Sequence, residues 1–224
     1  MTDTARANMS SVDATRSALE AAYDALKAFP DGQEPSGTAK LILEAVEDVL
    51  CEEGAEQFSM RSVAGRAGIS LAALQYHFGS KRDLLGQYFK LKNDEYHKAL
   101  RPLIVRQESD PERAIRATIG FFAKDSVSER THALYSQLLA ISTHDEIARA
   151  AMQKHMEVYH GLMALLVARL EPQASDSEIF IRAAAIVSMM EGLGTFGFAL
   201  RQRGRLSSAT ITRLADFAIA IAAG

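Results

Sequence analysis

The sequence predicts an all-α protein in which a small three-helix domain near the N-terminus is followed by a larger helical domain. Three observations support this fold class. Apolar residues recur at helical spacing, only five prolines interrupt them, and no run of alternating β-branched residues indicates a strand. We expect an N-terminal extension over residues 1–36, the small domain over residues 37–83 and the larger domain over residues 84–224.

The N-terminal extension contains a candidate helix over residues 12–29, where Val12, Leu19, Leu26 and Phe29 belong to one apolar stripe. The linker PDGQEP then ends this helix. Two interpretations stay open at this point. The helix is either an idle extension, or an arm that docks on the body of the protein or on a partner subunit.

The small domain begins with a helix from about Thr38 to Glu53, which Gly54 ends. Ser59 is a good N-cap for a second helix, because its hydroxyl can accept an unpaired backbone N–H of the first turn. Gly68 then breaks the helical pattern where a left-handed residue is needed to turn the chain.

A third short helix, Leu71–His77, follows with Ser70 as its cap. Two short helices about a glycine-containing turn form a helix-turn-helix, whose second helix can enter the major groove of DNA. A fourth helix begins at Lys81 behind Ser80, and we expect it to end before Pro102. It is too long for the small domain alone, so it should link the two domains.

The charge pattern agrees with contact to phosphates. The chain carries a net charge of −3, so any DNA binding must be local. Between residues 57 and 92 only one acid, Asp83, stands against six cations, which are Arg61, Arg66, Lys81, Arg82, Lys90 and Lys92. A basic island in an acidic chain is typical of a nucleic-acid footprint. The alternative is a solvated basic face beside an acidic one.

Two runs in this region carry a family resemblance: AGRAGIS at residues 64–70 and LQYHFGSKRDLL at residues 74–85. Over about residues 38–89 the chain resembles the DNA-binding domain of the tetracycline-repressor (TetR) family, and the string YHF-x-SK at residues 76–81 is specific. The resemblance implies a homodimeric transcriptional regulator, most often a repressor. Such a protein binds a near-palindromic double-stranded DNA operator and is released by a small-molecule effector.

The third helix is the expected base reader, because Leu71, Ala72 and Ala73 allow close approach and Gln75 can pair with adenine. The resemblance adds phosphate or groove contacts by Tyr76, among others. The expected DNA-binding residues are Ser59, Arg61, Ser70, Leu71, Ala72, Ala73, Gln75, Tyr76, His77 and Lys81. The chain departs from the family pattern where Ala72-Ala73 replaces Gly-Thr and Gln75 replaces the first of two tyrosines.

The second half of the chain reads as five further helices, namely Pro111–Lys124, Ser128–Ile141, Asp145–Leu170, Asp176–Arg203 and Ser208–Ala222. The fourth of these is apolar nearly all round, so it must be buried on more than one side. The resemblance implies that the last two helices, over about residues 176–222, pair across a two-fold axis to form a homodimer. The alternative is that both are ordinary monomer core.

Soft and polar residues lie inside the apolar periodicity of this half, and an adaptable cavity lined by methionine and aromatic side chains would suit an apolar effector. The candidates are Phe121, Phe122, His132, Tyr135, Met152, His155, Met156, Tyr159, Met163 and Phe196. The alternative interpretation is a packed core with satisfied histidine and tyrosine side chains.

The remaining patterns narrow the function. The sequence has no H-E-x-x-H, no phosphate-binding G-x-x-x-x-G-K-[ST] and no G-x-S-x-G elbow, so we expect no enzyme, no metal site and no cofactor. No signal-peptide pattern and no run of 18 apolar residues occurs, so we expect a cytoplasmic protein without a membrane span. The rival function is a helical dimer that binds a small molecule or protein without sequence-specific DNA binding.

The single cysteine, Cys51, excludes an internal disulfide framework and fits a reducing compartment. We expect it to be a small core residue of the first helix, because free cysteines are among the most buried residues. The alternative is a redox switch.

Overall fold

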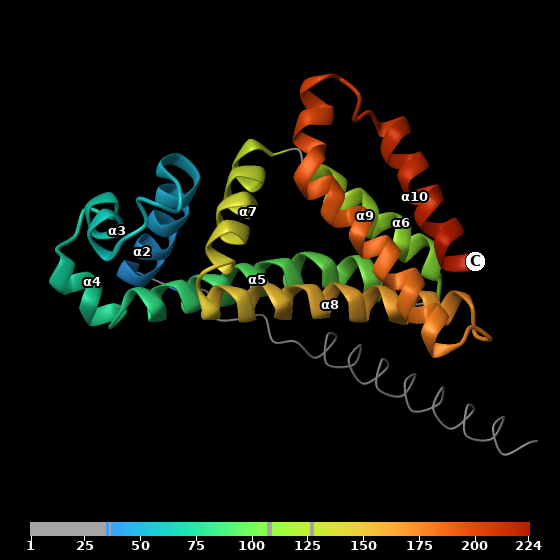
Figure 1. The fold of residues 1–224 in the computed structure, drawn as a ribbon, viewed down its shortest axis with the longest axis horizontal. Coiled ribbons are helices and arrows are strands. Elements are labelled where there is room, and N and C mark those ends of the chain that lie inside the picture. The colour runs from blue at the N-terminus through green and yellow to red at the C-terminus, as the bar shows by residue number, and fades with distance from the viewer. Residues whose placement is uncertain (1–34, 36, 107–108, 126–127) are drawn as a thin grey trace, which may run out of the picture. The chain divides into compact units, whose positions relative to one another are not determined.

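The computed structural model describes residues 35, 37–106, 109–125 and 128–224 (Figure 1). The expected helix over residues 12–29 lies outside these ranges. Within them the regular structure is entirely helical, without a strand, which confirms the predicted fold class.

The N-terminal helices are α2 (Gly37–Asp48), η1 (Val49–Glu53), α3 (Met60–Arg66), α4 (Leu71–His77) and α5 (Lys81–Val105). The predicted caps are confirmed. The Ser59 hydroxyl accepts the Ser62 N–H at 3.1 Å, and the Ser70 hydroxyl accepts the Ala73 N–H at 3.1 Å. The backbone therefore begins both short helices where the sequence predicts.

The first predicted helix ends in a π-helical turn, η1, in place of regular α-helix. The Gly54 N–H closes this wider turn by donating to the Val49 carbonyl at 3.0 Å, across five residues. Gly54 has a φ of 86°, a conformation that favours glycine, so the helix ends where expected.

The prediction that the fourth helix ends before Pro102 is wrong, because α5 continues to Val105. Proline inside a helix costs about 3 kcal/mol, since it cannot donate to the carbonyl one turn earlier. Leu100 and Ile104 flank it and are both buried. Each such burial contributes about 1.5–3 kcal/mol, which offsets the loss.

The later helices match the predicted ranges within two residues at each end: α6 (Pro111–Asp125), α7 (Glu129–Ser142), α8 (Glu146–Leu170), α9 (Asp176–Gln202) and α10 (Ser208–Ala223). Ser175 and Glu178 form a reciprocal capping box at the start of α9. Gly204, where the sequence predicts the end of α9, has a φ of 66° in the turn before α10, a left-handed conformation that favours glycine.

The chain forms two compact units, and neither is continuous in sequence. The helix-turn-helix unit comprises the described residues of Asp31–Tyr96 together with Ser128–His155. Its core therefore extends well beyond residue 83. Leu134 and Leu138 of α7 and Ala148 of α8 are buried in the same cluster as Ile42 and Val46 of α2.

The second unit comprises the described residues of His97–Val127 together with Met156–Gly224. Here α6, α9 and α10 pack together (Figure 1), and their residues Ile115, Ile119, Ile186 and Ala218 are fully buried. Both outer helices also carry large apolar side chains exposed to solvent: Phe180, Ile181 and Phe196 on α9, and Phe217 on α10.

The helix α9 is long and apolar enough to cross a membrane by length and composition. The helix, however, packs on α6 and α10, and its Ile186, Val187 and Met190 are buried. One such helix is weak evidence for a membrane span, because a core helix of a soluble protein passes the same test.

Candidate nucleic-acid interface

The helices α3 and α4 are joined by a tight turn at Gly68, whose φ is 69°. The Ile69 N–H donates to the Ala64 carbonyl at 3.0 Å and closes the turn. Val63 and Ala64 of α3 and Leu74 of α4 are buried in one core. The buried side chains hold α4 at a fixed angle to α3, as the helix-turn-helix prediction requires.

Helix α4 divides into a buried face and a solvent face. Leu74 and Phe78 are buried, as expected, while Ala72, Gln75, Tyr76 and His77 are exposed and Leu71 and Ala73 are half-buried. Tyr76 is 87% exposed and packs edge-to-face on His77, with 5.5 Å between the ring centroids. The ring of Tyr76 is therefore accessible to a binding partner.

The two N-cap serines, Ser59 and Ser70, are both exposed, but their hydroxyls already have partners in the protein. Ser59 also pairs with the Ser62 hydroxyl at 3.0 Å. These side chains therefore serve first to fix the ends of α3 and α4. What they can offer a phosphate is the row of backbone N–H groups that each helix start presents.

The basic island is smaller than the sequence predicts, because acids from elsewhere neutralise half of it. Arg66 pairs with Glu52 and Glu53 at 2.5 and 2.6 Å. Lys92 pairs with Glu47 at 2.8 Å and Lys90 with Asp94 at 2.7 Å. Asp94 lies on α5 just beyond the stretch over residues 57–92, and α2 and η1 bring Glu47, Glu52 and Glu53 against its cations.

Three cations remain on this surface: Arg61, Lys81 and Arg82 are exposed, and none has an ion pair within the described ranges. The Lys81 ammonium lies 4.9 Å from the ring centroid of Phe58, a cation–π distance. Arg82 is absent from the residues predicted to contact DNA. Its place beside Lys81 in the S-K-R-D string is the sequence signal that could have added Arg82 to the predicted DNA contacts.

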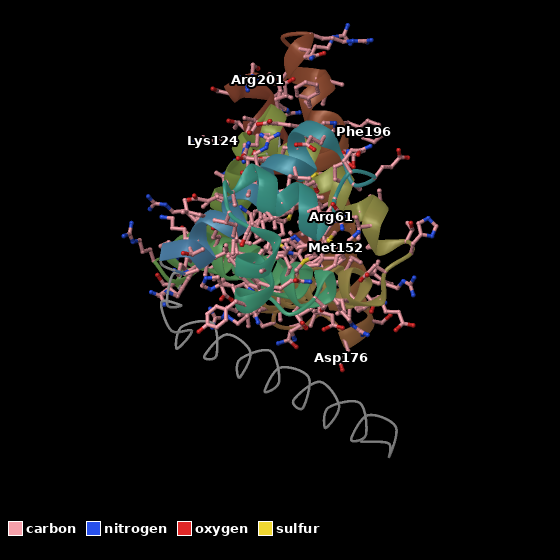
Figure 2. All side chains as sticks on the ribbon, turned by 90° about the vertical axis from the view of Figure 1, so that its left-hand side faces the viewer. Arg61, Lys124, Met152, Asp176, Phe196 and Arg201 are labelled. Atoms are coloured by element: carbon pink, nitrogen blue, oxygen red, sulfur yellow. The ribbon has the colours of Figure 1, made fainter. Side chains whose placement is uncertain are left out.

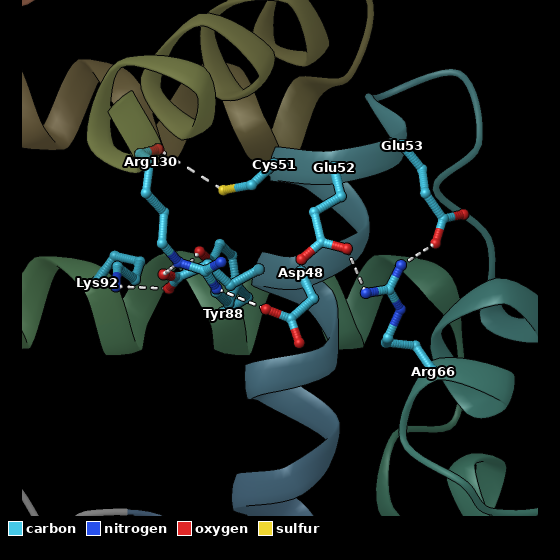
Figure 3. A network of polar contacts seen from close by, with 9 residues as sticks. Asp48, Cys51, Glu52, Glu53, Arg66, Tyr88, Lys92 and Arg130 are labelled. Atoms are coloured by element: carbon cyan, nitrogen blue, oxygen red, sulfur yellow. Dashed lines mark hydrogen bonds and ion pairs between the residues drawn. The ribbon is translucent and has the colours of Figure 1, made fainter. Parts of the chain in front are cut away.

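A partly buried polar cluster in the same unit joins Tyr88, Lys92 and Arg130 (Figure 3), and their shared acceptor is Glu47. Its carboxylate accepts from Lys92, from Arg130 at 2.9 Å and from the Tyr88 hydroxyl at 3.1 Å. Burial raises the pKa of Glu47, but the hydrogen bonds and charges of Lys92 and Arg130 outweigh burial and leave this pKa below its ordinary value. The carboxylate therefore stays ionised at neutral pH.

Cys51 lies in the π turn, half-buried against the same core, and its thiol donates to the Arg130 carbonyl at 3.7 Å. Burial raises the pKa of the Cys51 thiol. A protonated thiol is a poor nucleophile, so this environment fits the structural role and argues against a redox switch.

The residues predicted to line an effector cavity fall into two groups. In the second unit, Phe122 stacks edge-on against Phe121 and Tyr159, with ring centroids 5.4 and 5.0 Å apart. Tyr159 and Met163 are buried, and Met156 is half-buried. This aromatic cluster, defined by Phe121, Phe122 and Tyr159, is the part of the predicted site that the structure brings together.

The other candidates lie elsewhere. His132, Tyr135, Met152 and His155 belong to the helix-turn-helix unit. Met152 packs against its core, and the His155 imidazole pairs with the Asn93 side chain at 3.0 Å.

Phe196 is in the second unit but is 65% exposed, on the outer face of α9 (Figure 2). Helical spacing alone could not show on which side of α9 it would lie. Among the described residues, no group of three or more metal-ligating side chains is gathered.

Comparisons with known proteins agree with this geometry. Residues 42–88 match the family model described as bacterial regulatory proteins, tetR family. The HTH-type transcriptional regulator PksA of Bacillus subtilis (strain 168) is 25% identical over 158 residues, which cover 69% of this chain and 75% of PksA. The matched segment runs from α2 into α5 and contains the whole helix-turn-helix.

Solved structures show the same fold at low identity. A protein from Pseudomonas aeruginosa PAO1, described as a transcriptional regulator, has a TM-score of 0.70 and 15% identity, with 83% of this chain and 90% of that chain covered. One from Saccharomonospora viridis, in complex with choline, has a TM-score of 0.60 and 15% identity, with 81% and 93% covered.

Proposed function

We propose that this DNA-binding transcriptional regulator, whose residues 42–88 form a tetR-family domain, is a homodimeric repressor that a small molecule releases from a near-palindromic operator. The observation that carries the proposal is the solvent face of α4. Gln75, Tyr76 and His77 are exposed on a helix anchored by the fully buried Leu74. Arg61, Lys81 and Arg82, all exposed, lie on α3 and at the start of α5.

In the proposed complex, α4 enters the major groove. The Gln75 amide can donate to N7 and accept from N6 of one adenine, and Ala72 is small enough to lie against a thymine methyl. Arg61, Lys81 and Arg82 neutralise backbone phosphates, which supplies affinity without sequence information. The hydroxyl of Tyr76 is the proposed contact to a phosphate or groove edge.

The proposed dimer forms through α9 and α10. Phe180, Ile181, Phe196 and Phe217 are each more than half exposed, although a monomer gains nothing from apolar side chains in water. A two-fold axis across these helices would bury them against their counterparts. Two copies of α4 would then read half-sites about one helical turn apart, or roughly 34–36 Å.

The aromatic cluster of Phe121, Phe122 and Tyr159 is the proposed effector site. Its residues lie in one unit, and the similar protein from Saccharomonospora viridis was solved with choline, which supports a small-molecule ligand. An effector can shift the protein between two states only by its difference in affinity for them. We place the protein in the cytoplasm, with its operator, and assign it no catalytic role.

Selection of bound fragments from random DNA by the purified full-length protein tests the proposal. We expect enrichment of one near-palindromic sequence. The replacement of Gly-Thr by Ala72-Ala73 favours the rival, a helical ligand-binding dimer that lacks sequence-specific DNA binding. If no sequence is enriched while the protein remains folded and dimeric, the proposal fails and the rival is favoured.

A further inference from the structure

Four acids lie at the end of α2 and in the π turn η1 that follows it, two in each element. Glu47 and Asp48 close α2, while Glu52 and Glu53 end η1. Each pair holds a different arginine, and the two arginines come from different helices. Figure 3 shows Arg130 and Arg66 reaching this segment from opposite sides.

On the first side, α7 is fastened to the pair before the turn. Arg130 donates from Nε to Glu47 at 2.9 Å and from Nη2 to Asp48 at 2.7 Å. Two helical turns further along α7, the Gln137 side-chain oxygen accepts the Ala55 N–H at 2.8 Å. These polar contacts flank the buried Leu134, so α7 is held to α2 and to the loop behind η1.

On the second side, α3 is fastened to Glu52 and Glu53, the pair at the end of η1. Arg66 donates from Nη1 to Glu52 at 2.5 Å and from Nη2 to Glu53 at 2.6 Å. Arg66 is the last residue of α3, immediately before the Gly68 turn that leads into α4. Its guanidinium therefore ties the turn of the helix-turn-helix to the acidic segment.

We propose that residues 47–53 form an acidic bridge between α7 and α3, and that Arg130 is a positioning residue for the DNA-reading helix. Arg130 acts through this bridge: it fixes Glu47 and Asp48, the π turn carries Glu52 and Glu53, and Arg66 holds the end of α3. The consequence for DNA binding rests on the proposed function, whereas the mechanical link within the unit does not.

The exposure of these residues sets the size of the effect. Asp48, Glu52, Glu53, Arg66 and Arg130 all keep about a third or more of their side chain in solvent. Such ion pairs are individually weak, so the bridge adjusts the position and mobility of α3 without deciding whether the unit folds. Leu134, Leu138 and Ile42 hold the fold itself through burial.

The full-length protein offers a matched pair of variants. Arg130→Met removes the bridge contact, and Arg116→Met is the control. Arg116 is 45% exposed against 46% for Arg130, donates to Asp216 at 2.8 Å, and lies in the other unit. Both changes remove an ion-paired arginine of equal exposure and leave an apolar side chain of similar length.

Amide hydrogen exchange of the DNA-free protein is the first readout. Arg130→Met should speed amide exchange across α3 by about three- to tenfold. This effect would act at a distance, because the Arg130 side chain donates its hydrogen bonds to Glu47 and Asp48 on α2 and not to α3. Arg116→Met should leave α3 unchanged, and Arg130→Lys should lie between wild type and Arg130→Met. Unchanged exchange in α3 with Arg130→Met overturns the bridge. Equal acceleration in both arginine variants overturns it too.

Affinity for DNA is the second readout, with the duplex enriched from random DNA and a scrambled duplex of equal length as probes. Arg130→Met should lower the ratio of the two affinities about threefold or more, because a mobile α4 reads bases less well but still meets phosphates. Arg66→Met should lower this ratio too. In the double variant, the ratio should fall by less than the product of the two single-variant reductions, because both arginines act through the same bridge. If an enriched duplex exists but the ratio of affinities is unchanged in Arg130→Met, the positioning role is overturned. If no duplex is enriched, the proposed function fails, and hydrogen exchange in α3 still tests whether the bridge exists.

Discussion

The Lys81 ammonium lies 4.9 Å from the ring centroid of Phe58, a side chain that is itself buried in the core of the helix-turn-helix unit. Lys81 is the first residue of α5, directly behind the turn that ends α4. A charge held over a buried ring is oriented in advance, which lowers the entropy lost when it meets a phosphate.

Replacing Lys81 with alanine should therefore weaken binding to all duplexes, whatever their sequence. Loss of one phosphate contact in each subunit of the proposed dimer should reduce the slope of log affinity against log salt by about 1.8. Fluorescence anisotropy across a salt series measures this. Lys124→Ala, an exposed lysine on α6, serves as the control and should leave the slope unchanged. A loss confined to one sequence would contradict the phosphate role.

Gln75→Ala should relax the preference at a single base pair, because the exposed amide is the proposed partner of one adenine. We expect the discrimination at that position to fall by about 1–3 kcal/mol. Tyr76→Phe should instead weaken binding to every sequence. Competition with a set of singly substituted duplexes distinguishes the two patterns. Equal losses on all duplexes for Gln75→Ala would refute its role as a base reader.

Leu74→Ala tests how α4 is held, since Leu74 is 0% exposed while its neighbours face solvent. The cavity should lower the free energy of unfolding by about 2–5 kcal/mol. Leu41→Ala provides a control in the same unit, because Leu41 is 53% exposed and its truncation should cost less than about 0.5 kcal/mol. Urea denaturation followed by circular dichroism measures both free energies of unfolding. Similar losses in the two variants would show that Leu74 does not anchor α4 in the core.

Stability should fall in acid partly through Glu47. Hydrogen bonds from Lys92 and Arg130 place the pKa of its carboxyl below the ordinary value of 4.5 in the folded state. The contribution is therefore complete above pH 4.5 and is lost as pH falls through the lower, folded-state pKa.

Glu47→Gln should flatten this part of the stability profile between neutral pH and acid. The Glu112→Gln variant, with an exposed residue of α6, is the comparison and should keep the wild-type slope. Denaturant midpoints measured at closely spaced pH values give the result. A Glu47→Gln profile parallel to that of wild type would show that the cluster does not depend on this charge.

Phe196→Asp should convert the dimer to monomers, because Phe196 is exposed on α9 within the surface proposed to pair with a second copy. A charge at the centre of such an interface is strongly unfavourable once desolvated. Sedimentation velocity reports the change. Leu139→Asp is the control, since Leu139 is exposed on α7 outside that surface. If Phe196→Asp stays dimeric, the dimer forms elsewhere.

The sequence predicted the parts of the fold that depend on neighbouring residues. Ser59, Gly68 and Ser70 act within one helical turn, so their hydroxyls and backbone freedom can be read in order along the chain. The alternation of Leu74 and Phe78 with exposed residues follows from helical periodicity in the same way.

What depends on distant residues could not be predicted. Arg66 and Lys92 count as free cations in the sequence, but η1 brings Glu53 against Arg66 and α2 brings Glu47 against Lys92, from 13 and 45 positions earlier in the chain. Phe196 has helical spacing suited to a cavity, but periodicity does not say which side of α9 faces the core. Pro102 was expected to stop a helix because its local cost is visible, whereas the burial of Ile104 that offsets this cost is not.

The division of the chain between its two compact units has a consequence for how such regulators can be recombined. The helix-turn-helix unit uses two separate stretches, Asp31–Tyr96 and Ser128–His155, and helices α5 and α8 each run from one unit into the other. A chimera that exchanged only the first stretch would inherit a DNA reader without the α7 side chains that complete its core. A viable graft must move both stretches together, and helical phase has to be preserved at the two junctions that fall inside α5 and α8.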